Sequence, residues 1–392
     1  MDLNFGAEHE TFRSEVAAFI AEHWQGGGDQ RAAAEFRAKA IAQGYLYRAI
    51  PRRYGGSEQP ADPLKATIIR QAFNRAGAPA EIGGPGPSML VPTLLERGEE
   101  WQREKFVAKT LRGEIFWCQG YSEPGSGSDL ASLRTRAVRD GDEWVITGQK
   151  VWTSGADRAD YMFLLARTDP AAPKHEGLSY FLLDMKQPGV SVRPLRQMNG
   201  ASGFNEVFLD EARTPADWIV GEPGQGWAVS KSTLKFERDN IGSTATTEQA
   251  FRRLVELARS VQRGGRPAIE HEDVRQALAT IEGYVLAQKY SSYRQTSMNL
   301  RDHHAGLIET MGKLNGTLIG QRIAGLAQEL LGSDGLVMPP NSRTEGTARA
   351  NAKWVNQIMG SMAIAIAGGT SNIQRNVIAE RSLGLPREEK KA

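Results

Sequence analysis

The chain has 392 residues, of which 40% are hydrophobic and 24% are charged. This balance is ordinary for a globular protein and excludes a disordered or collagen-like chain. With 48 Lys and Arg against 46 Asp and Glu, the formal net charge is +2, which is too balanced for a protein that binds nucleic acid by neutralising phosphates. We therefore expect a chain of two or three globular domains that binds no nucleic acid.

The cysteine content and the lack of long apolar runs limit which cellular compartment and which kinds of site we expect. A single cysteine, Cys118, allows no intramolecular disulfide and no cysteine-cluster metal site, and the six histidines are scattered along the chain. The first residues do not resemble a secretory signal, and no run of about 18 apolar residues is present. We expect a cytoplasmic protein without a metal centre or a membrane span.

Helical periodicity dominates the first part of the chain. Apolar residues recur on one helical face near its start, at Phe12, Val16, Phe19 and Ile20. Beyond turns that are rich in glycine, residues 64–73 and 90–111 show helical patterns again. These patterns predict an N-terminal helical domain over residues 1–115.

Short β-rich runs follow, with turn residues between them. They lie at residues 144–147, 161–165, 178–183, 190–192 and 206–209. Because no helical pattern separates these runs, they predict an antiparallel sheet or small barrel. The middle β domain is expected over residues 116–225.

Helical patterns return from Gly226 onward. One stripe consists of Val274, Leu278, Ile281 and Val285. A last long helix is predicted over residues 354–367, and the run 263–267 is predicted as a loop. The sequence therefore predicts an α+β fold that closes with a C-terminal helical domain over residues 226–392.

Two short segments carry the residues best suited to bind a ligand. Residues 119–129 form a polar loop dense in glycine, whose backbone can approach a ligand closely and whose hydroxyl and N–H groups suit a phosphate or a heterocycle edge. Residues 148–154 bring a tryptophan and two hydroxyls to the end of a strand. Taken singly, the two segments are better explained as a surface turn and a core aromatic residue.

Together, the two segments resemble those of the acyl-CoA dehydrogenase family, whose middle β domain carries such a loop and such a tryptophan strand against FAD. Two further segments are similar to the family's pattern, residues 203–209 with Thr214 and Pro215, and the C-terminal run 369–381. The four matches occur in the family's order. The resemblance implies an acyl-CoA dehydrogenase-like fold that ends in a four-helix bundle.

The resemblance also implies FAD as the cofactor and places residues around its flavin ring. Tyr121 and Ser122 would meet the ring, with Gln119 close by. Trp152 would cover one face of the isoalloxazine, and Ser154 would donate a hydrogen bond near N5 or O4. Such donors stabilise reduced flavin, while an aromatic lid excludes water and oxygen.

Other residues would contact the rest of the cofactor or the substrate. By resemblance, Ser128 would lie near the diphosphate or near the thioester of the substrate. Thr370 and Asn372 would lie beside the ribityl and adenosine portions of FAD. Gln328 and Gly332 resemble an element that meets the adenosine half across a subunit interface.

The dehydrogenation that the resemblance implies needs a base, because thioester α-protons are weakly acidic. The commonest family arrangement places a glutamate directly before the Gly-Thr of the C-terminal motif, where this chain has Gly368. A minority arrangement places it on an earlier helix before an arginine, which matches Glu237 and Arg238. The alternative for these two residues is a solvated pair on a helix face. We expect Glu237 to remove the α-proton, Arg238 to contact the substrate, and hydride to pass to flavin N5, which yields the trans-2-enoyl-CoA.

The electron acceptor and the oligomer follow from the same resemblance. The expected acceptor is an electron-transfer flavoprotein, and the alternatives are an oxidase or monooxygenase of the same fold and a non-catalytic partner subunit. Family members usually carry an arginine that reaches the partner's FAD diphosphate, where this chain has Val261, with Arg263 and Arg266 as possible substitutes. The pattern is similar to the larger subunits of heteromeric acyl-CoA dehydrogenases, including those acting on steroid side chains. We expect either a homotetramer or a heterotetramer with a second dehydrogenase-like subunit.

Overall fold

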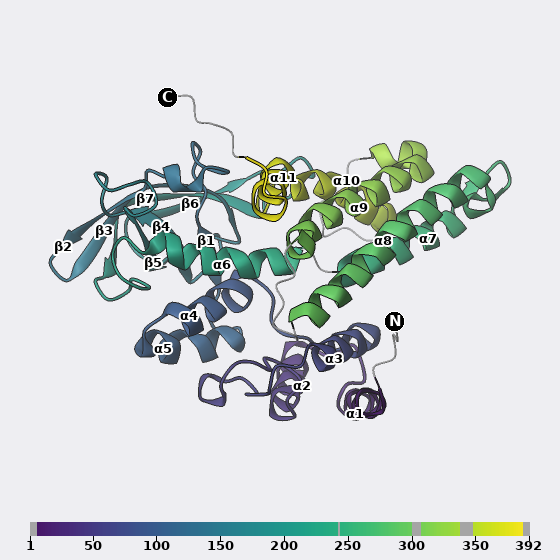
Figure 1. The fold of residues 1–392 in the computed structure, drawn as a ribbon, viewed down its shortest axis with the longest axis horizontal. Helices are drawn as coiled ribbons and strands as arrows, with labels where there is room; N and C mark the ends of the chain where they lie inside the picture. The colour runs from purple at the N-terminus through teal and green to yellow at the C-terminus, as the bar shows by residue number, and fades with distance from the viewer. Residues whose placement is uncertain (1–5, 242–243, 300–306, 338–347, 387–392) are drawn as a thin grey trace.

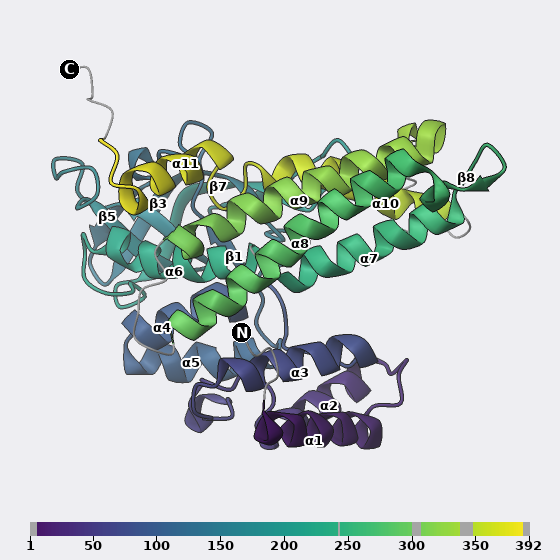
Figure 2. The same ribbon diagram turned by 45° about the vertical axis from the view of Figure 1, so that its right-hand side comes forward.

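The computed structural model describes residues 6–241, 244–299, 307–337 and 348–386. Helices form both ends of the chain, and a sheet lies between them in sequence (Figure 1). The sheet lies at one end of the long C-terminal helices, and the N-terminal helices lie along one side of the molecule (Figure 2). The predicted α+β fold, with its helical, β and helical parts, is confirmed.

The N-terminal part consists of short helices with well-defined starts. Its α-helices are α1 (Ala7–His23), α2 (Gln30–Ala42), α3 (Pro63–Ala76), α4 (Val91–Arg97) and α5 (Glu100–Leu111). Asp29 and Asp62 cap α2 and α3 by accepting backbone N–H groups of the first turn. The helical pattern over residues 90–111 corresponds to two helices, because Gly98 ends α4, and the side chain of Gln102 accepts the backbone N–H of Glu99 to start α5.

The middle part is a seven-stranded sheet. Its strands are β1 (Trp117–Gly120), β2 (Arg136–Asp140), β3 (Glu143–Ser154), β4 (Tyr161–Arg167), β5 (Leu178–Asp184), β6 (Val190–Leu195) and β7 (Phe204–Pro215). They follow the order β1-β4-β2-β3-β7-β6, with β5 paired to β4. The pairing is antiparallel as predicted, except that β1 and the start of β2 run parallel to β4. A parallel pair needs a long connection, which the β2–β3 hairpin and its flanking loops supply between β1 and β4.

The strands β4 and β5 are buried on both faces and separate two cores. Phe163 and Tyr180 stack with parallel rings 6.0 Å apart in the core shared with the N-terminal helices. Met162 and Phe181 point to the opposite core, which also contains Cys118. Burial raises the pKa of the Cys118 thiol, so Cys118 packs here as a small apolar residue.

The C-terminal part is built from long helices. They are α6 (Gly226–Ile241), α7 (Thr244–Ser260), α8 (Glu272–Asn299), α9 (Leu307–Leu331), α10 (Ala348–Ile364) and α11 (Ser371–Val377). The predicted stripe on α8 is buried as expected, against Leu254, Ile319 and Ile323 of the neighbouring helices. The predicted loop at 263–267 instead contains a small hairpin, β8 (Gln262–Arg263) with β9 (Arg266–Pro267), turned by two glycines. Within the described residues, no helix has both the length and the apolar character that a bilayer span needs.

The start of α6 is held against β5 by a close backbone approach at Gly226. A Cβ added to Gly226 would lie 2.5 Å from the backbone carbon of Ser179. The hydroxyl of Ser179 in turn accepts the backbone N–H of Gly224 at 2.9 Å. Only a glycine therefore allows α6 to leave the sheet at this place.

We expect Gly226→Ala to destabilise the fold by about 1–3 kcal/mol, because the added methyl group can be accommodated only if α6 or β5 moves. Urea unfolding of the variant would measure the loss. The matched control is Gly283→Ala in α8, where an added Cβ meets nothing within 4 Å. That substitution should raise the stability by about 0.5–1 kcal/mol, as expected for an open helix interior. Equal stabilities of the two variants would contradict the close approach at Gly226.

Candidate active site

The polar loop after β1 presents open backbone on the surface. An added Cβ at Gly125 or at Gly127 would meet nothing within 4 Å, so a ligand can approach the chain there. The loop is nevertheless ordered by its own hydroxyls. Ser126 and Ser132 both donate to the carbonyl oxygen of Asp129, at 2.7 and 2.6 Å. The loop is therefore a fixed, accessible turn, and its Ser128 side chain is exposed.

A buried ion pair joins this loop to β3. The Lys150 ammonium is fully buried and lies 2.9 Å from Oε1 of Glu123, whose side chain is 8% exposed. Lys150 also donates to the carbonyl oxygen of Tyr121, at 3.3 Å. The carboxylate of Glu123 accepts the backbone N–H groups of Arg134 and Thr135, at 2.6 and 2.9 Å. One pair of side chains thus fixes both ends of the loop to the strand that carries Trp152.

Burial and pairing act in opposite directions on these two groups. Burial opposes ionisation of Glu123, but the Lys150 charge and the hydrogen bonds to the carboxylate outweigh it and hold the pKa of Glu123 below its ordinary value. Burial lowers the pKa of Lys150 to about 8, although the Glu123 carboxylate raises it. Both groups are therefore charged near neutral pH, and each depends on the other.

Trp152 stands at an irregularity of β3. The register between β3 and β7 shifts between Lys150 and Thr153, and Trp152 adopts a left-handed backbone conformation with φ of 61°. Its indole is 62% exposed and lies edge-on to Phe204, with ring centroids 6.1 Å apart. The alternative of a core aromatic residue at this position is therefore wrong. The left-handed backbone is costly for a tryptophan, and it turns the side chain toward the surface.

The first group of predicted site residues lies together at this place. The backbone N–H of Val151 donates to the carbonyl oxygen of Ser122 at 2.9 Å, which ties the loop to the residue before Trp152. Ser154 is exposed like Trp152, two residues along the strand. Tyr121 is buried and Gln119 is half-buried. The structure thus brings Ser122, Trp152 and Ser154 to one region, although the two segments are about twenty residues apart.

The second group lies on the C-terminal helices and is itself divided. The hydroxyl of Thr370 caps α11 by accepting the N–H of Ile373, and α11 lies beside the sheet in both views (Figures 1 and 2). The Lys313 ammonium donates to the carbonyl oxygen of Gly369, at 2.8 Å. Gln328 lies 15 residues after Lys313 on α9, which is roughly 22 Å along a helix. Gln328 and the neighbouring Gly332 therefore lie far from Thr370 in the same chain.

The remaining predicted residues are placed as follows. Asn372 is exposed on α11 and accepts a hydrogen bond from Arg375. Glu237 and Arg238 belong to α6, but their side chains lie outside the described residues. Arg263, a predicted substitute for the missing interface arginine, is paired with Asp273 of its own chain.

Sequence reasoning missed Glu123 and Lys150. Both were present in the two recognised segments, and a lysine between apolar positions of a strand is a signal of a buried, paired charge. The partner could not be identified, because the pairing depends on the course of the loop between them.

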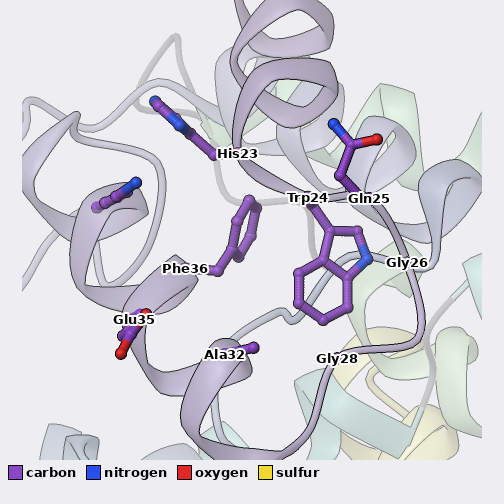
Figure 3. A pocket seen from close by; sticks show the side chains of 9 residues that line it. His23, Trp24, Gln25, Gly26, Gly28, Ala32, Glu35 and Phe36 are labelled. Atoms are coloured by element: carbon purple, nitrogen blue, oxygen red, sulfur yellow. The ribbon is translucent and has the colours of Figure 1, made fainter.

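A cavity of about 210 Å³ lies elsewhere, between the end of α1 and the start of α2 (Figure 3). The rings of Trp24 and Phe36 and the backbone of Gly26 line it. It contains none of the predicted site residues. Its volume is also below the roughly 300 Å³ at which small-molecule sites begin, so it is not a site for a dinucleotide.

Comparison with known proteins identifies the class of protein that this fold and site define. The chain matches the models of the N-terminal, middle and C-terminal domains of acyl-CoA dehydrogenase over residues 6–114, 118–212 and 224–383. It belongs to the acyl-CoA dehydrogenase family. It is therefore an oxidoreductase of a flavoprotein family, and its cofactor is FAD.

Several relatives are similar to this chain over nearly its whole length. Acyl-CoA dehydrogenase IpdE1 of Mycobacterium tuberculosis is 36% identical over 97% of this chain and 99% of its own length. FadE34 of the same organism is 37% identical over 97% of this chain and 50% of its own length. Among solved structures, the Tcur3481-Tcur3483 steroid ACAD has a TM-score of 0.79 at 30% identity, covering 99% of this chain and 100% of its own. The ChsE4-ChsE5 complex from Mycobacterium tuberculosis has a TM-score of 0.78 at 28% identity, over 99% and 100%.

We expect Lys150→Met to destabilise the protein by about 3–5 kcal/mol, because it leaves the Glu123 carboxylate buried without its partner. The double variant Glu123→Gln with Lys150→Met should lose less, since no uncompensated charge remains. Chemical unfolding at neutral pH would measure both.

The control is Lys174→Met, which breaks the pair with Asp129, where the two side chains are 42% and 63% exposed. It should cost less than about 1 kcal/mol. A double variant that is less stable than the single Lys150 variant would show that the buried charge is not the cause.

Proposed function

We propose that the protein dehydrogenates an acyl-CoA thioester to the trans-2-enoyl-CoA, with Glu237 removing the α-proton. FAD, when bound, would supply the acceptor for the β-hydride at its N5. The chemistry needs a carboxylate held close to the substrate's acidic carbon and shielded from water. The commonest position for this base in the family carries Gly368, with φ of 63° and no side chain. The proposed base must therefore come from another element, and Glu237 belongs to α6.

The anchoring of α6 is the observation that supports Glu237 most directly. Gly226, Ser230 and Thr233 form a buried stripe along this helix. Position 237 follows Thr233 by four residues, which places it on the same face of the helix, one turn further on. A base at this position would be carried by a helix that is fixed to β5 and to α4.

The residues around Trp152 fit the flavin part of FAD. The exposed indole of Trp152 offers a flat apolar surface to the ring system, and the hydroxyls of Ser122 and Ser154 are donors for its polar edge. The open backbone near Ser128 suits the diphosphate or the thioester. Thr370 and Asn372 would contact the ribityl and adenosine portions, and Arg238 the substrate.

We expect Glu237→Gln to lower the rate of flavin reduction by substrate by about 10²–10⁴-fold, while FAD remains bound. Anaerobic stopped flow with an acyl-CoA substrate measures that rate. Glu256→Gln on the exposed face of α7 is the control and should behave as the parent protein. A Glu237 variant that is reduced at the parent rate would reject the assignment.

We also propose the kind of acyl group that the substrate carries and the protein that accepts the electrons. The similarity to steroid ACAD structures favours an acyl group derived from a steroid, and the proposed acceptor is an electron-transfer flavoprotein. The cytoplasmic location stays a prediction.

We further propose that the chain works in a heteromer with a second dehydrogenase-like subunit. Two of its structural relatives are described as pairs, ChsE4-ChsE5 and Tcur3481-Tcur3483. In this chain Val261 replaces the usual interface arginine, and Arg263 is already paired with Asp273. Large apolar side chains are exposed on the C-terminal helices, among them Tyr284, Tyr290, Met362 and Ile364.

Native mass spectrometry of the chain purified alone tests this proposal. We expect no homotetramer that carries one FAD per subunit, because the site for the adenosine half would lack the partner's contacts. Addition of the partner subunit should restore full FAD content. A homotetramer of the isolated chain with one FAD in every subunit would contradict the heteromer.

A further inference from the structure

Four buried hydroxyl groups lie where α6 approaches residues 119–129, which we call the flavin loop, and each comes from a different element. They are Tyr121 after β1, Tyr180 of β5, Thr233 of α6 and Thr93 of α4. None of them is more than 5% exposed. We call these four residues the hydroxyl chain.

Three of the four hydroxyls contact one another, and the fourth residue packs against them through its ring. The hydroxyl oxygens of Thr93 and Thr233 lie 3.0 Å apart, and those of Thr233 and Tyr180 lie 3.4 Å apart. The rings of Tyr180 and Tyr121 meet edge to face with centroids 6.3 Å apart. Burial raises the pKa of Tyr180 far above its ordinary value, so its hydroxyl stays neutral.

Each of the two threonines also has an acceptor nearby in its own segment. Thr93 donates to the carbonyl oxygen of Met89 at 2.7 Å, so its lone pairs can accept from Thr233, whose other acceptors are the carbonyl oxygen of Val229 at 3.3 Å and the hydroxyl of Tyr180. Loss of the Thr233 hydroxyl removes a hydrogen-bond partner from the buried hydroxyls of Thr93 and Tyr180, which is costly in an apolar core. Apolar side chains tolerate small sliding movements, whereas the contacts of Thr233 with Thr93 and Tyr180 form only when α4, α6 and β5 keep one relative position.

We propose that the hydroxyl chain holds the helix of the catalytic base in register with the flavin loop, and that Thr233 is a positioning residue for Glu237. This inference rests on the proposed function, because it concerns the base one turn beyond Thr233. One end of the hydroxyl chain is Tyr121, which neighbours Ser122 in the flavin loop. At the other end it reaches α4 of the N-terminal helices. A displacement of the base by about 1 Å can lower a rate by up to about 10²-fold, so the register matters for catalysis.

The test compares Thr233→Val, which keeps the shape and removes the hydroxyl, with Thr233→Ser, which keeps the hydroxyl. We expect Thr233→Val to lower kcat about tenfold or more while KM for the acyl-CoA changes by less than about twofold. Thr233→Ser should restore most of the rate. The kinetic isotope effect with an α-deuterated substrate should rise in Thr233→Val, because proton abstraction becomes slower relative to the other steps.

Two measurements do not depend on turnover. Tyr180→Phe should shift the absorption spectrum of the bound flavin, because it removes the hydroxyl from the ring against which Tyr121 packs edge to face. Hydrogen exchange of the α6 amides should be faster in Thr233→Val than in the parent holoenzyme. The control is Ser232→Ala, which removes a different hydrogen bond between α6 and α4, from Ser232 to Glu96 at 3.0 Å. It should leave kcat and the flavin spectrum unchanged.

The outcomes separate this inference from the function on which it rests. If the parent protein is not reduced by any acyl-CoA, or if Glu237→Gln is reduced normally, the proposed function fails. If the parent is active but Thr233→Val keeps its kcat, the hydroxyl chain has no positioning role. A Thr233→Ser variant as slow as Thr233→Val, or a Ser232→Ala variant equally slow, would also overturn the inference, since general packing between α4 and α6 would then explain the effect.

Discussion

The buried ion pair between Glu123 and Lys150 is the constraint on which the candidate site depends. A loop rich in glycine has high conformational entropy, so it does not hold a ligand-binding shape by itself. Here one carboxylate accepts the backbone N–H groups of Arg134 and Thr135 and the ammonium of Lys150. The desolvation of two charges is costly, and it is offset because nearly every acceptor and donor of the pair is used. The glycines can therefore remain open to a ligand while the ends of the loop are fixed.

Directional contacts also determine where α6 lies. Apolar burial supplies most of the free energy of folding, but it specifies position only loosely, since neighbouring packings differ little. The contacts between Thr93 and Thr233 and the close approach of Gly226 to Ser179 each allow one arrangement. The helix of the proposed base is thus positioned by β5 and α4, whereas the loop of the proposed flavin site is fixed to β3 by the ion pair.

Much of the fold could be predicted from the sequence, because it depends on local periodicity. The apolar stripe of α8 predicts its buried face, and the β-rich runs predict strands. The structure confirms both predictions. What could not be predicted depends on partners distant in the chain. The parallel pairing of β1 with β4, the bulge that turns Trp152 outward and the partner of Lys150 are all fixed by contacts over 25 or more residues. The division of residues 90–111 at Gly98 is a local feature, because this glycine ends α4.

Because position 368 is a glycine, the contacts that position α6 matter for the proposed reaction. In a chain whose base precedes the C-terminal motif, the turn before α11 must position both the base and the cofactor. Here that turn carries no base, and it is held by the Lys313 ammonium at the carbonyl oxygen of Gly369 and by the capping hydroxyl of Thr370. If the base is Glu237, it is α6 that must be positioned accurately relative to the substrate. This helix crosses between the N-terminal helices and the sheet. Buried hydroxyls that join α4, α6 and β5 are the kind of contact that this demand requires, because they penalise a small displacement that apolar packing alone would tolerate.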